Sequence, residues 1–140
     1  MTQGPLVNIR VLDLTDELGA YCPKLLADLG ADVLKVEPPE GAPGRRRGPF
    51  AGDQPGPDRS LWWAFYNTNK RNLTLDLQSE DGRSRLVELT KSADVLTVSS
   101  LPRSEMTCAW NGATASGQIK PLSSWFVSMI VWTARPMPMP

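Results

Sequence analysis

Short apolar runs recur through the first hundred residues of the chain. Some of the segments between them carry apolar residues at the longer spacing of a helix. Three of these runs are rich in Val, Ile and Leu and predict buried strands, while a fourth alternates apolar and polar positions. They are "NIRVLDLT" (8–15), "ADVLKVE" (31–37), "ADVLTVS" (93–99) and the alternating "NLTLDL" (72–77).

Helical periods lie between these strands. Residues 16–30 carry apolar side chains at the spacing of a helix packed on a sheet, namely Leu18, Tyr21, Cys22, Leu25, Leu26 and Leu29. Because Pro23 fits only the first turn of a helix, we expect regular helix to begin near residues 20–22 and to end at Gly30. Ser79 caps a second predicted helix that ends near residue 92. Strand, helix and strand with short connections predict βαβ units, and thus an α/β fold with a Rossmann-like parallel sheet.

A long connection, "PPEGAPGRRRGPFAGDQPGPDRS" (38–60), is dense in Pro and Gly. Loops of this length inside a compact domain are usually functional or mobile. An aromatic cluster follows it and includes Trp62, Trp63, Phe65 and Tyr66. Aromatic rings beside basic residues can stack on a nucleotide base, but core packing is their commoner use, and we expect most of the four in the core.

Composition narrows the classes of function. Hydrophobic residues make up 41% and charged residues 21% of the 140, and fifteen Lys+Arg balance fifteen Asp+Glu. This balance favours one folded domain and disfavours a nucleic-acid binder that relies on bulk positive charge. With no histidine and two widely spaced cysteines, a zinc site and histidine acid–base chemistry are excluded, and we expect no metal. No secretory signal or apolar span of about 18 residues is present, so we expect a cytoplasmic protein without a membrane partner.

The last third of the sequence has a different character. Of the 41 residues from Ser100 to Pro140, four are charged, and this segment holds four of the five Met and three of the five Trp. One apolar run, "WFVSMIVW" (125–132), could form a strand. We therefore predict an N-terminal folded region at 1–98 and an atypical, poorly ordered or frame-shifted tail at 99–140.

In open α/β sheets, ligands bind beyond the carboxyl ends of the strands, which here are followed by residues 15–19, 37–47 and 99–103. A dinucleotide site is one alternative, because Glu37 follows Gly19 by 18 residues, near the spacing of a ribose-binding acid. The first turn, however, has one glycine where the dinucleotide fingerprint needs three. Asp16 and Glu17 would also face the pyrophosphate, so this alternative is disfavoured.

Three adjacent arginines, Arg45 to Arg47, lie in the Gly- and Pro-rich loop directly after a predicted parallel strand. Their guanidinium groups could clamp a pyrophosphate or another polyanion, or could form a solvated surface run. Lys70 and Arg71 add positive charge just before the strand at 72–77. Cys22 has no histidine to activate it, so we predict an inert buried thiol.

The stretch "VLDLTDELGAYCPKLLADLGADVLKVEPPEGAPGRRRGPF", followed by "NTNKRNLTLDL" and "ADVL", resembles the N-terminal part of family III CoA-transferases, the CaiB/BaiF group. The resemblance runs from about residue 6 to about residue 97. That group includes formyl-CoA and carnitine CoA-transferases and α-methylacyl-CoA racemases. The resemblance implies a Rossmann-like domain that takes coenzyme A or acyl-CoA as a substrate, in much longer subunits that form interlocked homodimers. This chain would be truncated relative to them.

The resemblance also implies a set of cofactor contacts on the loops after the first strands. These are Lys35, Glu37, Pro38, Arg45, Arg46, Arg47, Asn69, Lys70, Arg71 and Leu75. Members of the family often carry arginine where Pro38 stands, so here that charge would come from the triple-arginine loop.

Two departures from the family pattern concern catalysis. After "ADVL" the family reads close to "VENFRPG", whereas this chain has "TVSSLPRS". The family moves CoA between carboxylic acids through an acyl intermediate on an aspartate further along, and no Asp follows Asp94 here. A carboxylate nucleophile divides one difficult step into easier ones, so its loss predicts a catalytically incomplete copy to which we assign no catalytic residue. A non-catalytic CoA-binding or interaction module, a racemase fragment and a piece without function of its own remain alternatives.

Overall fold

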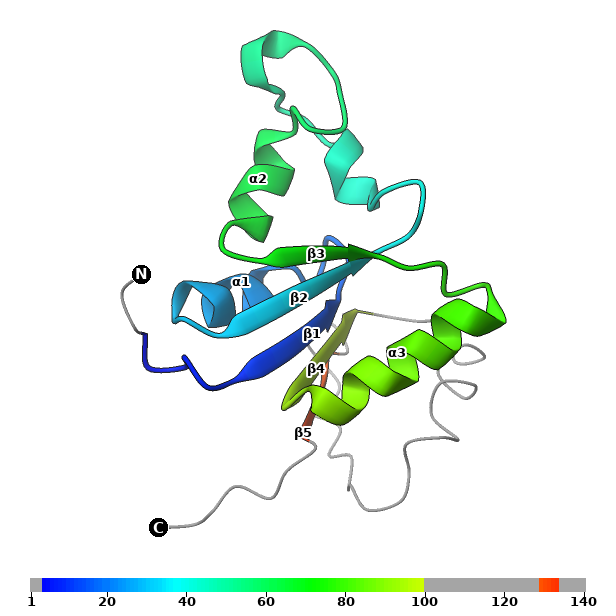
Figure 1. Cartoon of the computed structure of the whole chain (residues 1–140). Coiled ribbons are helices and arrows are strands. Elements are labelled where there is room, and N and C mark those ends of the chain that lie inside the picture. The colour runs from blue at the N-terminus through cyan, green and yellow to red at the C-terminus, as the bar shows by residue number, and fades with distance from the viewer. Residues whose placement is uncertain (1–3, 100–128, 134–140) are drawn as a thin grey trace.

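The computed structural model describes residues 4–99 and 129–133, and Figure 1 shows a sheet with helices packed around it. In chain order its elements are β1 (Arg10–Leu14), α1 (Tyr21–Asp28), β2 (Asp32–Glu37), the 3-10 helices η1 (Pro43–Arg46) and η2 (Ala51–Asp53), α2 (Leu61–Asn67), β3 (Arg71–Thr74), α3 (Glu80–Ser92), β4 (Val95–Ser99) and β5 (Met129–Thr133).

The sheet has the strand order β3-β2-β1-β4-β5. Strands β1 to β4 are parallel, with Leu12 opposite Leu34 on β2 and Leu96 on β4, and β5 pairs antiparallel with β4. This arrangement confirms the predicted α/β fold with βαβ units. The chain steps outward from β1 through β2 to β3 and then returns to the other side of β1, so the strand order reverses between β1 and β4. Ligands of doubly wound sheets bind at such a reversal.

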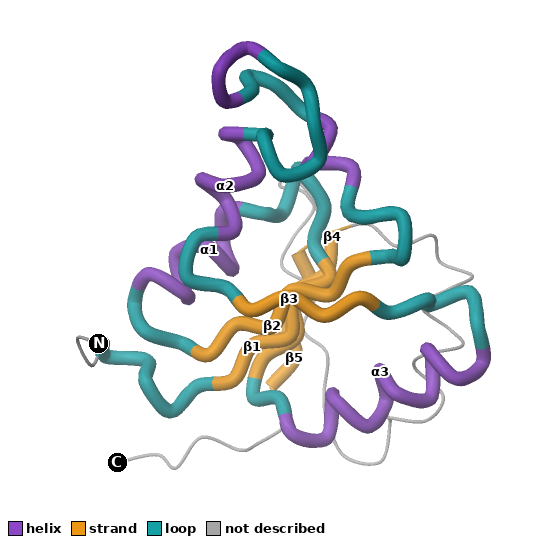
Figure 2. Tube along the Cα trace, turned by 45° about the horizontal axis from the view of Figure 1, so that its top comes forward, coloured by secondary structure: helices purple, strands orange, loops and turns teal. Residues whose placement is uncertain are grey.

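Helices cover the two faces of the sheet, with α1 and α2 on one side and α3 on the other (Figure 2). Alternate residues of each strand point to opposite faces, so each face has its own core. Val11 and Val33 pack with Ala27 and Ala31 beneath α1, whereas Leu12, Val36, Leu75, Leu86 and Ala93 form the core beneath α3.

Local signals set the ends of the two longer helices as predicted. The Ser79 hydroxyl accepts the backbone N–H of Gly82 at 3.0 Å and so caps α3, a contact whose loss costs about 1 kcal/mol in comparable helices. Gly30 takes φ +95° directly after α1, a conformation that glycine adopts without strain.

The face of α1 that is buried differs from the apolar stripe that the sequence predicts. Its buried residues are Pro23, Lys24 and Ala27, whereas Leu18 is 74% and Tyr21 is 55% exposed. Small side chains let the helix axis approach Val11 and Val33 closely, and this places part of the leucine stripe on the outer side. The periodicity was sufficient to predict a helix but not which face of it meets the sheet.

Helix α2 lies within the predicted aromatic cluster, for which no helix was expected. Ser60 starts it by accepting the N–H of Trp63 at 3.0 Å. Trp63 is buried, Trp62 and Tyr66 are half-buried and Phe65 is 55% exposed, so the expectation that most of the four rings are core was wrong. A seven-residue helix buries only a narrow strip, and the ring on that strip, Trp63, packs beside Gly44 and Arg45 of the loop after β2.

The alternating run at 72–77 forms a strand only as far as Thr74, where β3 ends. The Asp76 carboxylate accepts the N–H of Gln78 at 2.9 Å, which turns the chain toward α3. In the last third, the predicted strand at 125–132 overlaps β5, and its residues 125–128 lie outside the described part. The boundary at 98/99 stays a prediction, since β4 ends at Ser99.

Candidate functional site at the carboxyl edge of the sheet

Two loops and the end of β4 meet at the carboxyl ends of the parallel strands. The Asp16 N–H donates to the Ser99 hydroxyl, which joins the turn after β1 to the end of β4. The Lys35 ammonium donates to the Thr15 carbonyl oxygen, and Arg47 forms an ion pair with Glu17. The loops at 15–19 and 37–47 therefore lie together beside Ser99, with the arginines at the strand tips. Residues 100–103 of the third predicted ligand loop lie outside the described part.

A cleft of about 370 Å³ opens at this edge, between the ends of β1, β2 and β3. Its apolar lining includes Leu14, Leu75, Leu77 and the prolines 38, 39 and 43, while Asp16, Glu40 and Asp76 bring carboxylates to it. Of the predicted contacts, Lys35, Pro38 and Leu75 line this cleft. Its walls suit an uncharged group better than a phosphate, because three carboxylates face a single lysine there.

Arg45 is engaged by Glu37, the last residue of β2. Its Nε and Nη2 atoms donate to the two oxygens of the Glu37 carboxylate at 2.6 and 2.8 Å, and Nη1 reaches Asp58 at 3.0 Å. Its guanidinium also lies 4.6 Å from the ring centroid of Trp63. Burial would raise the pKa of Glu37, but the hydrogen bonds from Arg45 and from the Ala42 N–H outweigh it and leave that pKa below its usual value. Arg45 thus fastens the loop to the strand.

Arg46 and Arg47 face outward, in contrast to Arg45. Arg46 is exposed, and its Nη2 donates to the Glu40 carbonyl oxygen at 2.8 Å. The side chain of Arg47 is 49% exposed, lies with its guanidinium 5.2 Å from the Trp62 ring centroid and pairs with Glu17. These two guanidinium groups are the accessible members of the triple-arginine run.

Lys70 and Lys35 lie inside the protein around Asp13 of β1. Lys70 Nζ is 2.9 Å and Lys35 Nζ 3.6 Å from the Asp13 carboxylate, and the side chains of Lys70 and Asp13 are completely buried. The Thr15 N–H and hydroxyl donate to the same carboxylate at 2.8 and 2.7 Å. Burial lowers the pKa of Lys70, an effect that Asp13 opposes. These groups hold the turn after β1 in place. The side chains of Lys70 and Asp13 are closed to a ligand, and the Lys35 ammonium is turned to Thr15 and Asp13.

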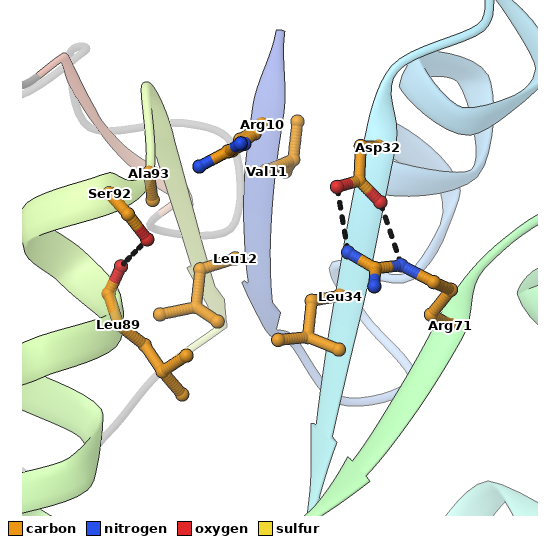
Figure 3. A pocket seen from close by; sticks show the side chains of 9 residues that line it. All are labelled: Arg10, Val11, Leu12, Asp32, Leu34, Arg71, Leu89, Ser92 and Ala93. Carbon is orange, nitrogen blue, oxygen red and sulfur yellow. Dashed lines mark hydrogen bonds and ion pairs between the residues drawn. The ribbon is translucent and has the colours of Figure 1, made fainter.

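The remaining predicted contacts lie away from the cleft. Asn69 takes a left-handed φ of 65° and donates to Asp28 at 3.1 Å. Arg71 begins β3 at the amino end of the sheet, where it forms a bidentate pair with Asp32 at 2.8 and 2.7 Å. Figure 3 shows this pair in a second cleft, of about 330 Å³, which Arg10 of β1 and Ser92 of α3 also line.

Sequence reasoning missed several residues that build the edge. Gly19 lies where a Cβ atom would come within 2.9 Å of the Thr15 Cβ and 3.0 Å of the Ser99 Cβ, so the turn needs a residue without a side chain. Asp13 organises the buried lysines, although it was treated only as part of a strand. Its position could have indicated this role, because Asp13 and Lys35 both lie inside runs that the sequence predicts to be buried strands.

Cys22 is half-buried, and burial raises the pKa of its thiol, with the negative charge of Asp13 acting in the same direction. The thiolate is therefore disfavoured, in agreement with an inert cysteine. Among residues 4–99 and 129–133, no group of three His, Cys, Asp or Glu side chains is placed to hold a metal ion. The same described residues include no helix with the length and apolar character to cross a membrane.

Comparison with known proteins decides the family. The sequence model of CoA-transferase family III matches residues 6–108. The chain belongs to this family. The BbsE subunit of succinyl-CoA:(R)-benzylsuccinate CoA-transferase of Thauera aromatica is 47% identical over 95 residues, which are 68% of this chain and 23% of that subunit. Formyl-CoA:oxalate CoA-transferase of Streptomyces coelicolor is 44% identical over 97 residues, which are 69% of this chain and 23% of that protein.

Solved structures agree with the family III assignment. A CaiB/BaiF family protein from Brucella suis superposes with a TM-score of 0.66 at 28% identity, over 82% of this chain and 30% of that one. A hypothetical protein from Mycobacterium tuberculosis gives a TM-score of 0.63 at 28% identity, and the match covers 76% of this chain and 28% of that one. The chain thus spans about a quarter of the length of the curated relatives it matches.

Proposed function

We propose that this chain binds the coenzyme A part of an acyl-CoA at the carboxyl edge of its sheet. The observation that carries the proposal is the position of Arg46 and Arg47, two accessible guanidinium groups beside the strand tips in a member of a CoA-transferase family. Guanidinium groups bind phosphate oxygens through charge-assisted hydrogen bonds. The adjoining cleft, with its apolar lining, would take uncharged parts of the ligand.

The ten contacts implied by the family resemblance then divide into direct and supporting roles. Arg46, Arg47, Pro38 and Leu75 would touch the ligand directly. Lys35, Glu37, Arg45 and Lys70 would act through the turn and the loop that they hold, because each is engaged by a partner within the protein. Asn69 and Arg71 make contacts remote from the cleft, so we assign them to the support of α1 and of the amino edge of the sheet.

The proposal separates binding from catalysis. Matched relatives are CoA-transferases, and general CoA transfer is the activity that the family supports. In this sequence no aspartate follows Asp94, and Ser99 and Ser100 stand where the family pattern has its Asn and Phe. We therefore propose that these 140 residues, a truncated copy of a CoA-transferase, form a CoA-binding module that is non-catalytic by itself and does not carry out the aspartyl acyl-transfer reaction alone. A cytoplasmic location belongs to the same proposal.

Titration calorimetry with coenzyme A tests the binding step. We expect saturable binding by the 140-residue chain, and a Kd increased at least tenfold in the double variant Arg46→Ala/Arg47→Ala, since two charge-assisted contacts are lost. A matched double variant, Arg85→Ala/Lys91→Ala, removes the same charge from exposed positions on α3 and should bind as the wild type does. Equal losses in the two double variants would show that net charge, and not the site, controls binding.

Transfer of CoA from succinyl-CoA to a second carboxylic acid, followed by chromatography of the thioesters, tests the catalytic step. We expect no turnover above a protein-free control. Measurable transfer by the purified chain would contradict the assignment of a non-catalytic module while leaving the binding site intact.

A further inference from the structure

The ion pair between Glu17 and Arg47 connects two loops that flank the carboxyl edge. Glu17 lies in the turn after β1 and Arg47 in the loop after β2, thirty residues later. Both side chains are partly exposed, at 40% and 49%. The contact is therefore open to water and to any solute that reaches the edge.

Arg47 is held ready for an anion by a second contact. Its guanidinium lies over the ring of Trp62, which orients the group without neutralising its charge. Within the described part of the chain, Arg47 is the cation that pairs with Glu17. The Glu17 carboxylate thus occupies the Nη1 donor of Arg47, which a phosphate oxygen could otherwise take.

We infer that Glu17 is an internal counter-ion that competes with the anionic ligand for Arg47 and so lowers the affinity of the site. This inference rests on the proposed binding of coenzyme A. A phosphate group that takes the Nη1 donor of Arg47 must displace the Glu17 carboxylate. A salt bridge of this exposure is weak, so displacement is feasible and its effect on affinity is modest.

Removal of the charge on Glu17 isolates the effect. In Glu17→Gln we expect the Kd for coenzyme A to fall by about two- to fivefold at low ionic strength, the range that corresponds to an exposed ion pair. The gain should shrink in high salt, because screening weakens the competition. Glu88→Gln is the matched control, since Glu88 forms an exposed pair with Lys91 on α3, and it should leave the Kd unchanged.

A double-mutant cycle tests whether the effect passes through Arg47. We expect Arg47→Gln to weaken binding and Glu17→Gln to bring no further gain in that background. Thermal unfolding of each variant checks that the fold is kept. A tightening that persists in the Arg47→Gln background would overturn the inference, as would a Kd for Glu17→Gln equal to or higher than that of the wild type.

The outcomes separate this inference from the proposed function. If the wild type binds coenzyme A and Glu17→Gln binds it equally well, the counter-ion role is wrong and the site stands. Absence of binding in both proteins refutes the site and the counter-ion together. Binding that is detected only in Glu17→Gln supports both.

Discussion

Arg45→Met tests whether the first arginine of the run is a fastening residue. The substitution keeps an apolar chain against Trp63 but removes the guanidinium that donates two hydrogen bonds to the Glu37 carboxylate. Glu37 is 4% exposed and keeps the Ala42 N–H at 3.1 Å as a remaining hydrogen-bond partner. The variant therefore leaves a buried carboxylate only partly satisfied.

The expected loss of stability follows from that burial. Removing one partner of a fully buried ion pair costs about 3–5 kcal/mol. The Arg45 side chain is 19% exposed, and water can enter where it stood, so we expect about 2–4 kcal/mol. For a chain of 140 residues this corresponds to a fall in Tm of roughly 10 °C.

Urea and thermal unfolding followed by circular dichroism measure the effect, with Arg46→Met as the matched control. Arg46 is the adjacent residue, carries the same charge and is exposed, so its substitution should change the free energy of unfolding by less than about 0.5 kcal/mol while weakening coenzyme A binding. Equal stability of the two variants would refute the assignment of Arg45 to the fold.

The pH dependence gives a second check on the same pair. Because the pKa of Glu37 is lowered in the folded protein, its contribution to stability is present above the ordinary glutamate pKa and is lost as the pH falls through the folded value. The difference in stability between the wild type and Arg45→Met should therefore shrink below about pH 4. A difference that stays constant down to pH 3 would exclude the ionised Glu37 carboxylate as its source.

Two further substitutions test the turn after β1. Gly19→Ala places a Cβ atom within 3.0 Å of Thr15 and Ser99, so we expect a loss of about 1–3 kcal/mol in urea unfolding, whereas Gly56→Ala meets only the flexible Arg59 side chain and should change little. Lys70→Met removes the 2.9 Å partner of the buried Asp13 carboxylate, and we expect it to lower stability by about 2–4 kcal/mol at pH 7. Because burial lowers the pKa of Lys70, the folded protein releases this proton at a lower pH than the unfolded chain does. The stability of the wild type should therefore rise with pH between the folded pKa and the ordinary lysine pKa, and this rise should be absent from Lys70→Met.

The strand–helix pattern could be predicted from the sequence because its signals are local. Runs of Val, Ile and Leu marked β1, β2 and β4, while Pro23, Gly30 and Ser79 marked helix ends. The parallel arrangement then followed from the short connections. Helix α2 escaped prediction because seven consecutive residues, rich in aromatic side chains, have no distinctive period, and its start depends on a single hydroxyl contact from Ser60.

The roles of the basic residues could not be predicted in the same way. Arg45, Arg46 and Arg47 are equivalent in sequence, but the 3-10 turn at Pro43–Arg46 directs the first toward Glu37 and leaves the next two at the surface. Lys70 adjoins Arg71, and yet one side chain is sealed inside while the other reaches solvent. Such differences depend on contacts between residues far apart in the chain, which a local pattern does not record.

The cluster of Lys35, Asp13 and Lys70 has a consequence for how the fold responds to salt. Two ammonium groups share one carboxylate in a compartment closed to counter-ions, so dissolved ions hardly weaken the attraction among these three groups. Exposed ion pairs such as Glu17–Arg47 lose most of their attraction in concentrated electrolyte, whereas this enclosed cluster keeps its own. The turn after β1 should therefore stay in place in brine that loosens the ion pairs of the exterior.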